Sequence, residues 1–469
     1  MTSSATRSWA REEFGHARLG DERRTARAVA MAATALSRPA GRVSDVFIDD
    51  AERQGAYDFL ESAAVHADAL GAAMGEACAR RCAEHRYVLV PVDGTSLTLT
   101  DVHRTKDFGA IGTYRAGARG LKVVDAIAVS PTGIPLGCLA LRWWARTAPV
   151  GASPSYTRPV RQSETQHWLA VIDEVREQLQ SHPDTRAWFQ LDREADGWAK
   201  LKHLSAGGDL FTVRSSWNRR VRTKRGRSYL REVLRRREPC GSYLLEVSAG
   251  RDRTARLACM QMRAAAVTLD LRDKKTSQHW TLVVNAVWTR EIGTTPRSEQ
   301  PVEWLLLTNA SIAEAADVEL VVQGYAQRWR IEDFHKTWKS GVCDVESTQL
   351  RARSHVIKWA TLLAAVATRV ERLKHLAREA PDAPASVELS DAEIQATILL
   401  KREYKKRTET IPDSMPTIAQ ATYWIAQLGG YTGKSSGGPP GSVTIGRGLR
   451  DVLVAARLLA NLGIAKKKR

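Results

Sequence analysis

Apolar runs that end in an aspartate constrain the middle of this chain most strongly. The apolar part of YVLVPVDGTSLTLT (residues 87–100) ends at Asp93. The segment RAWFQLDREADGWAKLKHL (186–204) is predicted to be a buried strand that ends at Asp192 and leads directly into a helix. Further elements are predicted as strands at 121–130, 134–144 and 209–214 and a helix at 163–180. Strands that alternate with helices indicate a mixed α/β domain.

The flanking regions differ in character from this α/β region. The first ~65 residues are predicted to form short helices, and the chain is mostly helical again after about 370. The densest basic run, RSSWNRRVRTKRGRSYLREVLRRRE (214–238), is followed by consecutive predicted strands over about 240–300. The α/β pattern resumes at VEWLLLTN (302–309) and the helix that follows it. The order therefore predicts a helical N-terminal module, an α/β core interrupted by a β-rich insertion, and a helical C-terminal module.

The net charge points to a polyanionic partner. The chain has 70 Lys and Arg against 52 Asp and Glu, a formal charge of +18, and a pI near 9.8. Such an excess favours nucleic acid first and an anionic membrane second. The longest uncharged apolar run, WATLLAAVAT (359–368), is about half the length of a bilayer span, and the N-terminus has no apolar signal core. Six scattered cysteines without a Cys-x-x-Cys pair predict reduced thiols and argue against a structural zinc site. The 11 histidines show no paired metal-ligand spacing either, so we expect any metal to be held by oxygen atoms.

The stretch YAQRWRIEDFHKTWKSG (325–341) is predicted to lie on one long helix. At 100° per residue, Tyr325, Arg328, Glu332 and Lys339 share one narrow stripe, whereas the apolar side chains fall on the opposite side. Taken alone, this helix favours a surface ion-pair role for Glu332, with partners at i−4 and i+4.

Two strand-end aspartates and a helix-borne glutamate provide another interpretation. A carboxylate at the carboxyl end of a strand in an α/β fold projects toward the crevice where such folds bind ligands. Each aspartate alone is more often a turn or helix-capping residue. Together, Asp93, Asp192 and Glu332 supply the oxygen-rich set that a pair of Mg²⁺ ions needs for phosphodiester chemistry.

These motifs resemble one family in particular. Tyr325, Arg328, Glu332 and Lys339 match the Tyr-x2-Arg-x3-Glu-x6-Lys signature of the bacterial DDE cut-and-paste transposases of the insertion-sequence-four group, in its transposon-five branch. VDGTSL resembles the block with the first catalytic aspartate of that family, and DREAD the block with the second. LGDERRTAR and QGAYDFLES resemble its N-terminal end-binding domain, and EWLLLTN and IAQLGGY resemble later blocks. The resemblance runs from about residue 9 to about 450.

The resemblance implies an RNase H-like catalytic core with a β-strand insertion, flanked by an N-terminal helical DNA-binding domain and a C-terminal helical dimerisation domain. The corresponding boundaries are 1–65 for the domain that binds transposon ends, 66–370 for the catalytic domain with its insertion at about 240–300, and 371–469 for the dimerisation domain. It also implies a homodimer in a synaptic complex with double-stranded DNA, both transposon ends and target. The protein would be bacterial and cytoplasmic, associated with the nucleoid and without a membrane partner.

The implied activity is excision of an element by nicking, hairpin formation and hairpin opening, followed by joining of its 3′ ends to target DNA. Two Mg²⁺ ions per site, replaceable by Mn²⁺, would be held by Asp93, Asp192 and Glu332. Trp304 of EWLLLT would stack on a flipped base, unless it is simply a strand residue packed in the core. The other DNA-contacting residues that the resemblance and the charge pattern imply are Tyr325, Arg328, Lys339, Arg214, Arg23, Arg24 and Arg27.

Two other classes stay open at this point. One is a catalytically silent DNA-binding regulator or domesticated relative, and the other is an RNase H-like nuclease without strand transfer. The intact acidic set argues against the first, because carboxylates that face phosphate do not help a protein that only binds DNA. The sequence does not give the terminal repeats, the target preference or whether the element is mobile.

Overall fold

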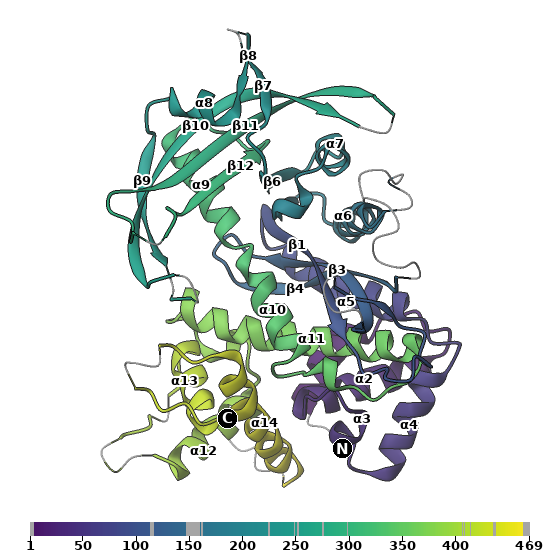
Figure 1. Cartoon of the computed structure of the whole chain (residues 1–469). Helices are drawn as coiled ribbons and strands as arrows, with labels where there is room; N and C mark the ends of the chain where they lie inside the picture. Colours follow the sequence, from purple (N-terminus) through teal and green to yellow (C-terminus); the bar gives the residue numbers. More distant parts are fainter. Residues whose placement is uncertain are drawn as a thin grey trace.

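One large mixed sheet organises the molecule. The computed structural model describes residues 4–112, 117–146, 160, 163–223, 226–247, 249–250, 253–273, 276–297, 299–405, 407, 409–412, 414–434 and 438–462. The sheet has the strand order β2-β3-β1-β5-β6-β12-β11-β10-β7-β8, with β4 paired to β3 and β9 paired to β10. Helical domains lie at its lower end in Figure 1.

The α/β core has the predicted RNase H-like topology. Its strands are β1 (Tyr87–Thr98), β3 (Arg119–Val129), β4 (Pro135–Trp144), β5 (Arg186–Leu191) and β6 (Leu210–Arg214), with the short β2 (Gly109–Ala110) at the edge. The order β4-β3-β1-β5-β6 is antiparallel from β4 to β1 and parallel from β1 to β6. Helices α6 (Thr165–Leu179) and α7 (Trp198–Ala206) connect the parallel strands, as parallel pairing requires.

The two faces of this core bury different side chains. Alternation along β1 directs Val88, Val90 and Val92 into the apolar cluster that includes α6 and α7, and Leu89 into the cluster on the other face. The second cluster is formed with α9 (Ala315–Ala326), α10 (Trp329–Lys339) and α11 (Arg353–Glu379). The strand period therefore decides which side chains of β1 face α10.

The β-rich insertion begins earlier than the sequence indicates. Its strands continue the same sheet, and the basic run 214–238 itself contributes the hairpin β7–β8 and helix α8. The elements are β7 (Arg220–Thr223), β8 (Gly226–Tyr229), α8 (Leu230–Arg235), β9 (Gly241–Val247), β10 (Arg256–Arg272), β11 (His279–Ile292) and β12 (Glu303–Thr308). The basic residues hide this hairpin from apolar periodicity, because its strands lie at an edge where charged side chains stay solvated.

The helical ends of the chain meet on α11. This 27-residue helix is buried along most of its length and contacts α2, α5, α13 and α14 as well as β4. In Figure 1 it runs between the N-terminal helices in purple and the C-terminal helices in yellow. The N-terminal helices are α1 (Ser4–Phe14), α2 (Glu22–Ser37), α3 (Val43–Val46), α4 (Asp50–Glu61) and α5 (Ala67–Cys82). The C-terminal helices are α12 (Asp391–Glu403), α13 (Ile418–Leu428) and α14 (Ser442–Asn461).

The expectation of one long helix over 325–341 is wrong. Tyr325 belongs to α9, and α10 starts only at Trp329. Between them the backbone tightens: Arg328 N–H donates to Tyr325 O and Ile331 N–H donates to Arg328 O, both three residues back. The tight turn keeps the signature residues close together, but on two helices.

Two smaller expectations have clear outcomes. None of the helices in the described part of the chain is both long and apolar enough to cross a membrane. The six cysteines are all free thiols, as predicted.

Candidate active site

Two neighbouring strands bring Asp93 and Asp192 side by side. The parallel register between β1 and β5 ends at the pair Val92 and Leu191, and Asp93 and Asp192 are the residues that follow this pair. Asp192 comes directly after β5 as predicted, whereas Asp93 lies inside β1, because this strand continues to Thr98 in its pairing with β3. Adjacent strands lie about 4.8 Å apart, so the two carboxylates leave the sheet next to each other. The strand period places them on the same face, because Leu89 and Trp188 at even spacing both belong to the cluster under α9, α10 and α11.

Helix α10 places Glu332 over this same face. Its apolar residues Ile331, Phe334 and Trp338 are fully buried against the sheet and α11, as the helical period predicts. Glu332 lies on the other side, with 43% of its side chain exposed. The helix thus has a packed face and a face that opens toward the aspartates.

Arg328 joins the helix-borne carboxylate to the first aspartate. Its Nη1 lies 3.3 Å from Asp93 Oδ2 and its Nη2 lies 3.2 Å from Glu332 Oε1. The guanidinium is buried, and its Nε has no hydrogen-bond partner. One cation therefore connects two of the three predicted ligands. Of the two ion pairs that the helix predicts for Glu332, the one with Arg328 at i−4 is present.

The electrostatic environment of Asp93 is unusual for a carboxyl group. The pKa of Asp93 is raised to about 7: burial is the largest cause, His335 and Arg328 lower the pKa, and the neighbouring charge of Asp192 raises it. A carboxyl group with a strongly raised pKa beside a second carboxylate is a candidate for a functional site.

The three side chains suit a hard divalent cation. All offer carboxylate oxygens, the ligands that Mg²⁺ and Mn²⁺ prefer, and the buried Nε of Arg328 between two of them has no hydrogen-bond partner. Asp93 Oδ1 accepts Gly94 N–H and Asp192 Oδ1 accepts Glu194 N–H, each at 2.8 Å. These bonds orient the aspartates, and the other oxygen of Asp93, Oδ2, faces Arg328.

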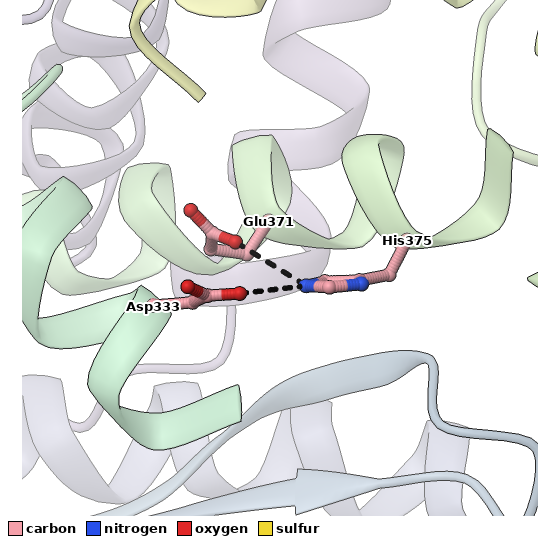
Figure 2. Close-up of side chains that lie close together, drawn as sticks. All are labelled: Asp333, Glu371 and His375. Atoms are coloured by element: carbon pink, nitrogen blue, oxygen red, sulfur yellow. Dashed lines mark hydrogen bonds and ion pairs between the residues drawn. The ribbon is translucent and has the colours of Figure 1, made fainter. Parts of the chain in front are cut away.

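A second carboxylate cluster lies behind α10 and has a different character. Figure 2 shows Asp333 of α10 close to Glu371 and His375 of α11. Each of these side chains has one possible metal-ligand atom within 4.8 Å of those of the other two. The Lys374 ammonium already lies 3.0 Å from Asp333 Oδ2 and 2.5 Å from Glu371 Oε2. Ser442, the first residue of α14, donates to Glu371 Oε1 at 2.6 Å. The cluster is therefore an ion-pair junction between α10, α11 and α14, buried at Glu371 and His375 and partly exposed at Asp333.

The remaining signature residues fall into two groups. Lys339 reaches back to β1, with Nζ 3.2 Å from Thr95 Oγ1, so it lies beside the aspartate-bearing strand as the signature predicts. Tyr325 is buried instead of facing outward, because it belongs to the packed face of α9 rather than to α10. Its ring packs edge-to-face on Trp304, with centroids 5.4 Å apart.

Trp304 and Arg214 occupy neighbouring strands at this end of the sheet. Trp304 on β12 is buried, so its position is that of the core alternative rather than of an exposed stacking platform. Arg214 ends β6, is half-buried, and donates from Nη2 to Glu303 O at 3.0 Å. Burial lowers the pKa of Arg214, and the Tyr325 phenol opposes that shift.

The N-terminal arginines lie on α2, outside the elements that carry the three carboxylates. Asp21 caps the helix by accepting Arg23 N–H, and Arg23 and Arg27 are exposed. Arg24 is partly buried and donates to Leu19 O at 3.0 Å. Exposed arginines on a helix provide a generic phosphate-binding surface.

Sequence reasoning missed two features next to the carboxylates. Asp125 on β3 is the register partner of Asp93 and contacts His335 of α10. These segments are far apart in the sequence, so no local motif predicts the contact. Trp217 lies in the loop after β6 and is 66% exposed. Its position inside the basic run was the available signal for it, since aromatic side chains among arginines are typical of nucleic-acid surfaces.

Comparison with protein families agrees with this geometry. Residues 6–65 match the family "Transposase DNA-binding", residues 157–369 match "Transposase DDE domain", and residues 365–460 match "Transposase Tn5 dimerisation domain". The chain belongs to the Tn5-like DDE transposases of the insertion-sequence-four group. The family confirms the predicted kind of protein and the order of its three domains.

Membership in this family also identifies the partners in outline. The DNA-binding and dimerisation domains identify DNA and a second copy of the transposase as partners, and DDE transposases use a divalent metal ion. The matched DDE segment contains Asp192 and Glu332, whereas Asp93 precedes it.

Proposed function

We propose that this transposase binds the inverted-repeat ends of its element as a dimer, excises the element by Mg²⁺-dependent nicking, hairpin formation and hairpin opening, and joins the 3′ ends to target DNA. The observation that carries the proposal is that Asp93 lies beside Asp192 on the neighbouring strand and shares the Arg328 guanidinium with Glu332 of α10. We assign the end-binding domain to 1–65, the catalytic domain to 66–370 and the dimerisation domain to 371–469.

In this proposal Asp93, Asp192 and Glu332 hold the divalent metal. A pair of such ions activates the attacking water or 3′-hydroxyl and stabilises the leaving oxygen of the phosphodiester. Arg328 keeps Asp93 and Glu332 together and supplies positive charge beside the scissile phosphate. Lys339, held beside Thr95, contributes a second cation to the same edge of the sheet.

Product analysis tests this function. Purified protein is incubated with the DNA that flanks its gene, labelled at the 5′ ends, with and without Mg²⁺, and the products are separated on a denaturing gel. We expect Mg²⁺-dependent nicks and hairpins at one inverted repeat, and joined products when target DNA is added. Nicks without hairpins or joining would indicate a nuclease, and binding without any cleavage would indicate a silent regulator.

Replacement of Trp304 tests the stacking role. In Trp304→Ala we expect hairpin formation to slow by roughly ten- to a hundred-fold, because stacking on an extrahelical base contributes about 1–3 kcal/mol. The first nick should change much less, since it needs no flipped base. Rates of the two steps on the same labelled DNA provide the measurement, and equal slowing of both would refute the role.

The burial of Trp304 against Tyr325 calls for a control. Trp304→Phe keeps an aromatic ring in the core, so we expect it to fold normally and to retain most of the hairpin rate. If Trp304→Phe and Trp304→Ala slow hairpin formation alike while both remain folded, stacking is not the function of this side chain.

Replacement of Arg214 tests its contact with DNA. Arg214→Ala should weaken end binding and reduce the slope of log affinity against log salt by about 1, as expected for one lost phosphate contact. Titrations at several salt concentrations measure both quantities. Lys405→Ala removes an exposed charge beyond α12 and serves as the control. An unchanged slope in Arg214→Ala would exclude this contact.

A further inference from the structure

A buried Asp–His pair lies directly behind the proposed metal ligands. Asp125 of β3 is the antiparallel register partner of Asp93, so the two side chains lie on the same face of the sheet. Asp125 Oδ1 lies 2.8 Å from Nε2 of His335, which follows Glu332 by three residues on α10. One contact therefore connects the strand opposite Asp93 with the helical turn that carries Glu332.

This pair is not explained by stability alone. The Asp125 side chain is completely buried and its Oδ2 has no hydrogen-bond partner. A buried ion pair with an unsatisfied oxygen contributes little to stability compared with apolar side chains of the same size. What the pair does provide is a fixed contact between β3 and α10.

The pair also differs from the other link between the sheet and α10. Arg328 holds Asp93 and Glu332 through the same carboxylate oxygens that a metal would use. The contact between Asp125 and His335 uses none of these oxygens, so it can persist when metal binds.

We propose that Asp125 and His335 are positioning residues that fix the separation of Asp93 and Glu332 for metal binding. This inference rests on the proposed function, because it concerns the same divalent metal. Residues behind metal ligands orient them, and their replacement typically weakens metal affinity by about 10- to 100-fold.

The sign of the effect separates positioning from simple electrostatics. His335 contacts the Asp125 carboxylate; burial lowers the pKa of His335, but the charge and hydrogen bond of Asp125 outweigh burial and favour its charged form, which by itself repels a divalent cation. Removal of that charge should strengthen metal binding if charge alone mattered. Loss of positioning should weaken it.

The test is calorimetric titration of the full chain with Mn²⁺. In His335→Leu we expect Mn²⁺ affinity about tenfold lower than in the wild type. His335→Gln, whose amide nitrogen can still reach Asp125, should bind Mn²⁺ within about twofold of the wild type or more tightly, because it keeps the contact. His203→Leu removes a similar contact, to Asp173 at 2.7 Å between α7 and α6, and should leave Mn²⁺ affinity unchanged. Wild-type or higher affinity in His335→Leu would overturn the proposal.

A second pair of variants covers the case in which His335→Leu does not fold. His335→Asn and His335→Gln carry the same amide and differ by one methylene group in reach. Positioning predicts weaker Mn²⁺ binding in the Asn variant, and equal affinities would overturn it. If the wild type binds no Mn²⁺, or if Glu332→Gln binds it as well as the wild type, the proposed function fails; if both behave as expected but His335→Leu is unchanged, only this inference fails.

Discussion

Glu332→Gln should reduce DNA cleavage by at least about a thousand-fold, equivalent to about 4 kcal/mol of transition-state stabilisation. The substitution keeps the size and shape of the side chain and removes the anionic oxygen that would bind the metal. Arg328 would lose the charge of one of its two carboxylate partners but would keep Asp93. End binding should stay close to that of the wild type, because the predicted N-terminal DNA contacts on α2 are untouched.

The matched control is Glu319→Gln, which makes the same chemical change on the exposed side of α9. Cleavage is measured on 5′-labelled flanking DNA, and binding by gel shift of the same DNA. We expect full cleavage in the control. Substantial cleavage in Glu332→Gln would mean that the carboxylate is an ordinary ion-pair partner of Arg328.

Lys374→Met should lower the free energy of unfolding by about 3–5 kcal/mol, the largest expected effect on stability in this chain. Lys374 is buried between Asp333 and Glu371, and its loss leaves their negative charges uncompensated next to His375. Methionine preserves most of the side-chain volume, so the effect reports charge and not a cavity. Denaturant unfolding followed by circular dichroism gives the measurement.

Two further variants establish the cause. Lys336→Met removes an exposed lysine from α10 and should change the free energy of unfolding by less than about 0.5 kcal/mol. Lys374→Met combined with Glu371→Gln should recover part of the loss, since the buried negative charge of Glu371 is then absent. A Lys374→Met protein as stable as the wild type would show that the junction in Figure 2 contributes no net ion pairing.

The core of the fold was predictable because its signals are local. The apolar run before Asp93 and the strand before Asp192 each carry a strong pattern, and the parallel pairing of these two strands brings the aspartates together. The end of the apolar run is not the end of the strand, however, because β1 continues to Thr98. The apolar face of α10 was likewise predicted by its 3.6-residue period, with Ile331, Phe334 and Trp338 all buried.

Features that depend on tertiary contacts could not be predicted in the same way. The break between α9 and α10 leaves the spacing of the signature intact, so periodicity cannot detect it. The burial of Tyr325 depends on its contact with Trp304 of strand β12, and the periodicity of the helix alone does not show this contact. The contact of Asp125 with His335 joins residues more than two hundred positions apart. The hairpin β7–β8 was hidden because its charged residues carry no apolar alternation.

Metal-directed cleavage of the protein backbone tests the three-carboxylate site most directly. Fe²⁺ takes the place of Mg²⁺, and ascorbate with peroxide then generates radicals that cut the chain next to the bound ion. We expect three sets of fragments, cut near Asp93, Asp192 and Glu332, and their suppression by excess Mg²⁺. Cuts confined to the neighbourhood of Glu371 and His375, with none near Asp93 or Asp192, would contradict the proposed active site.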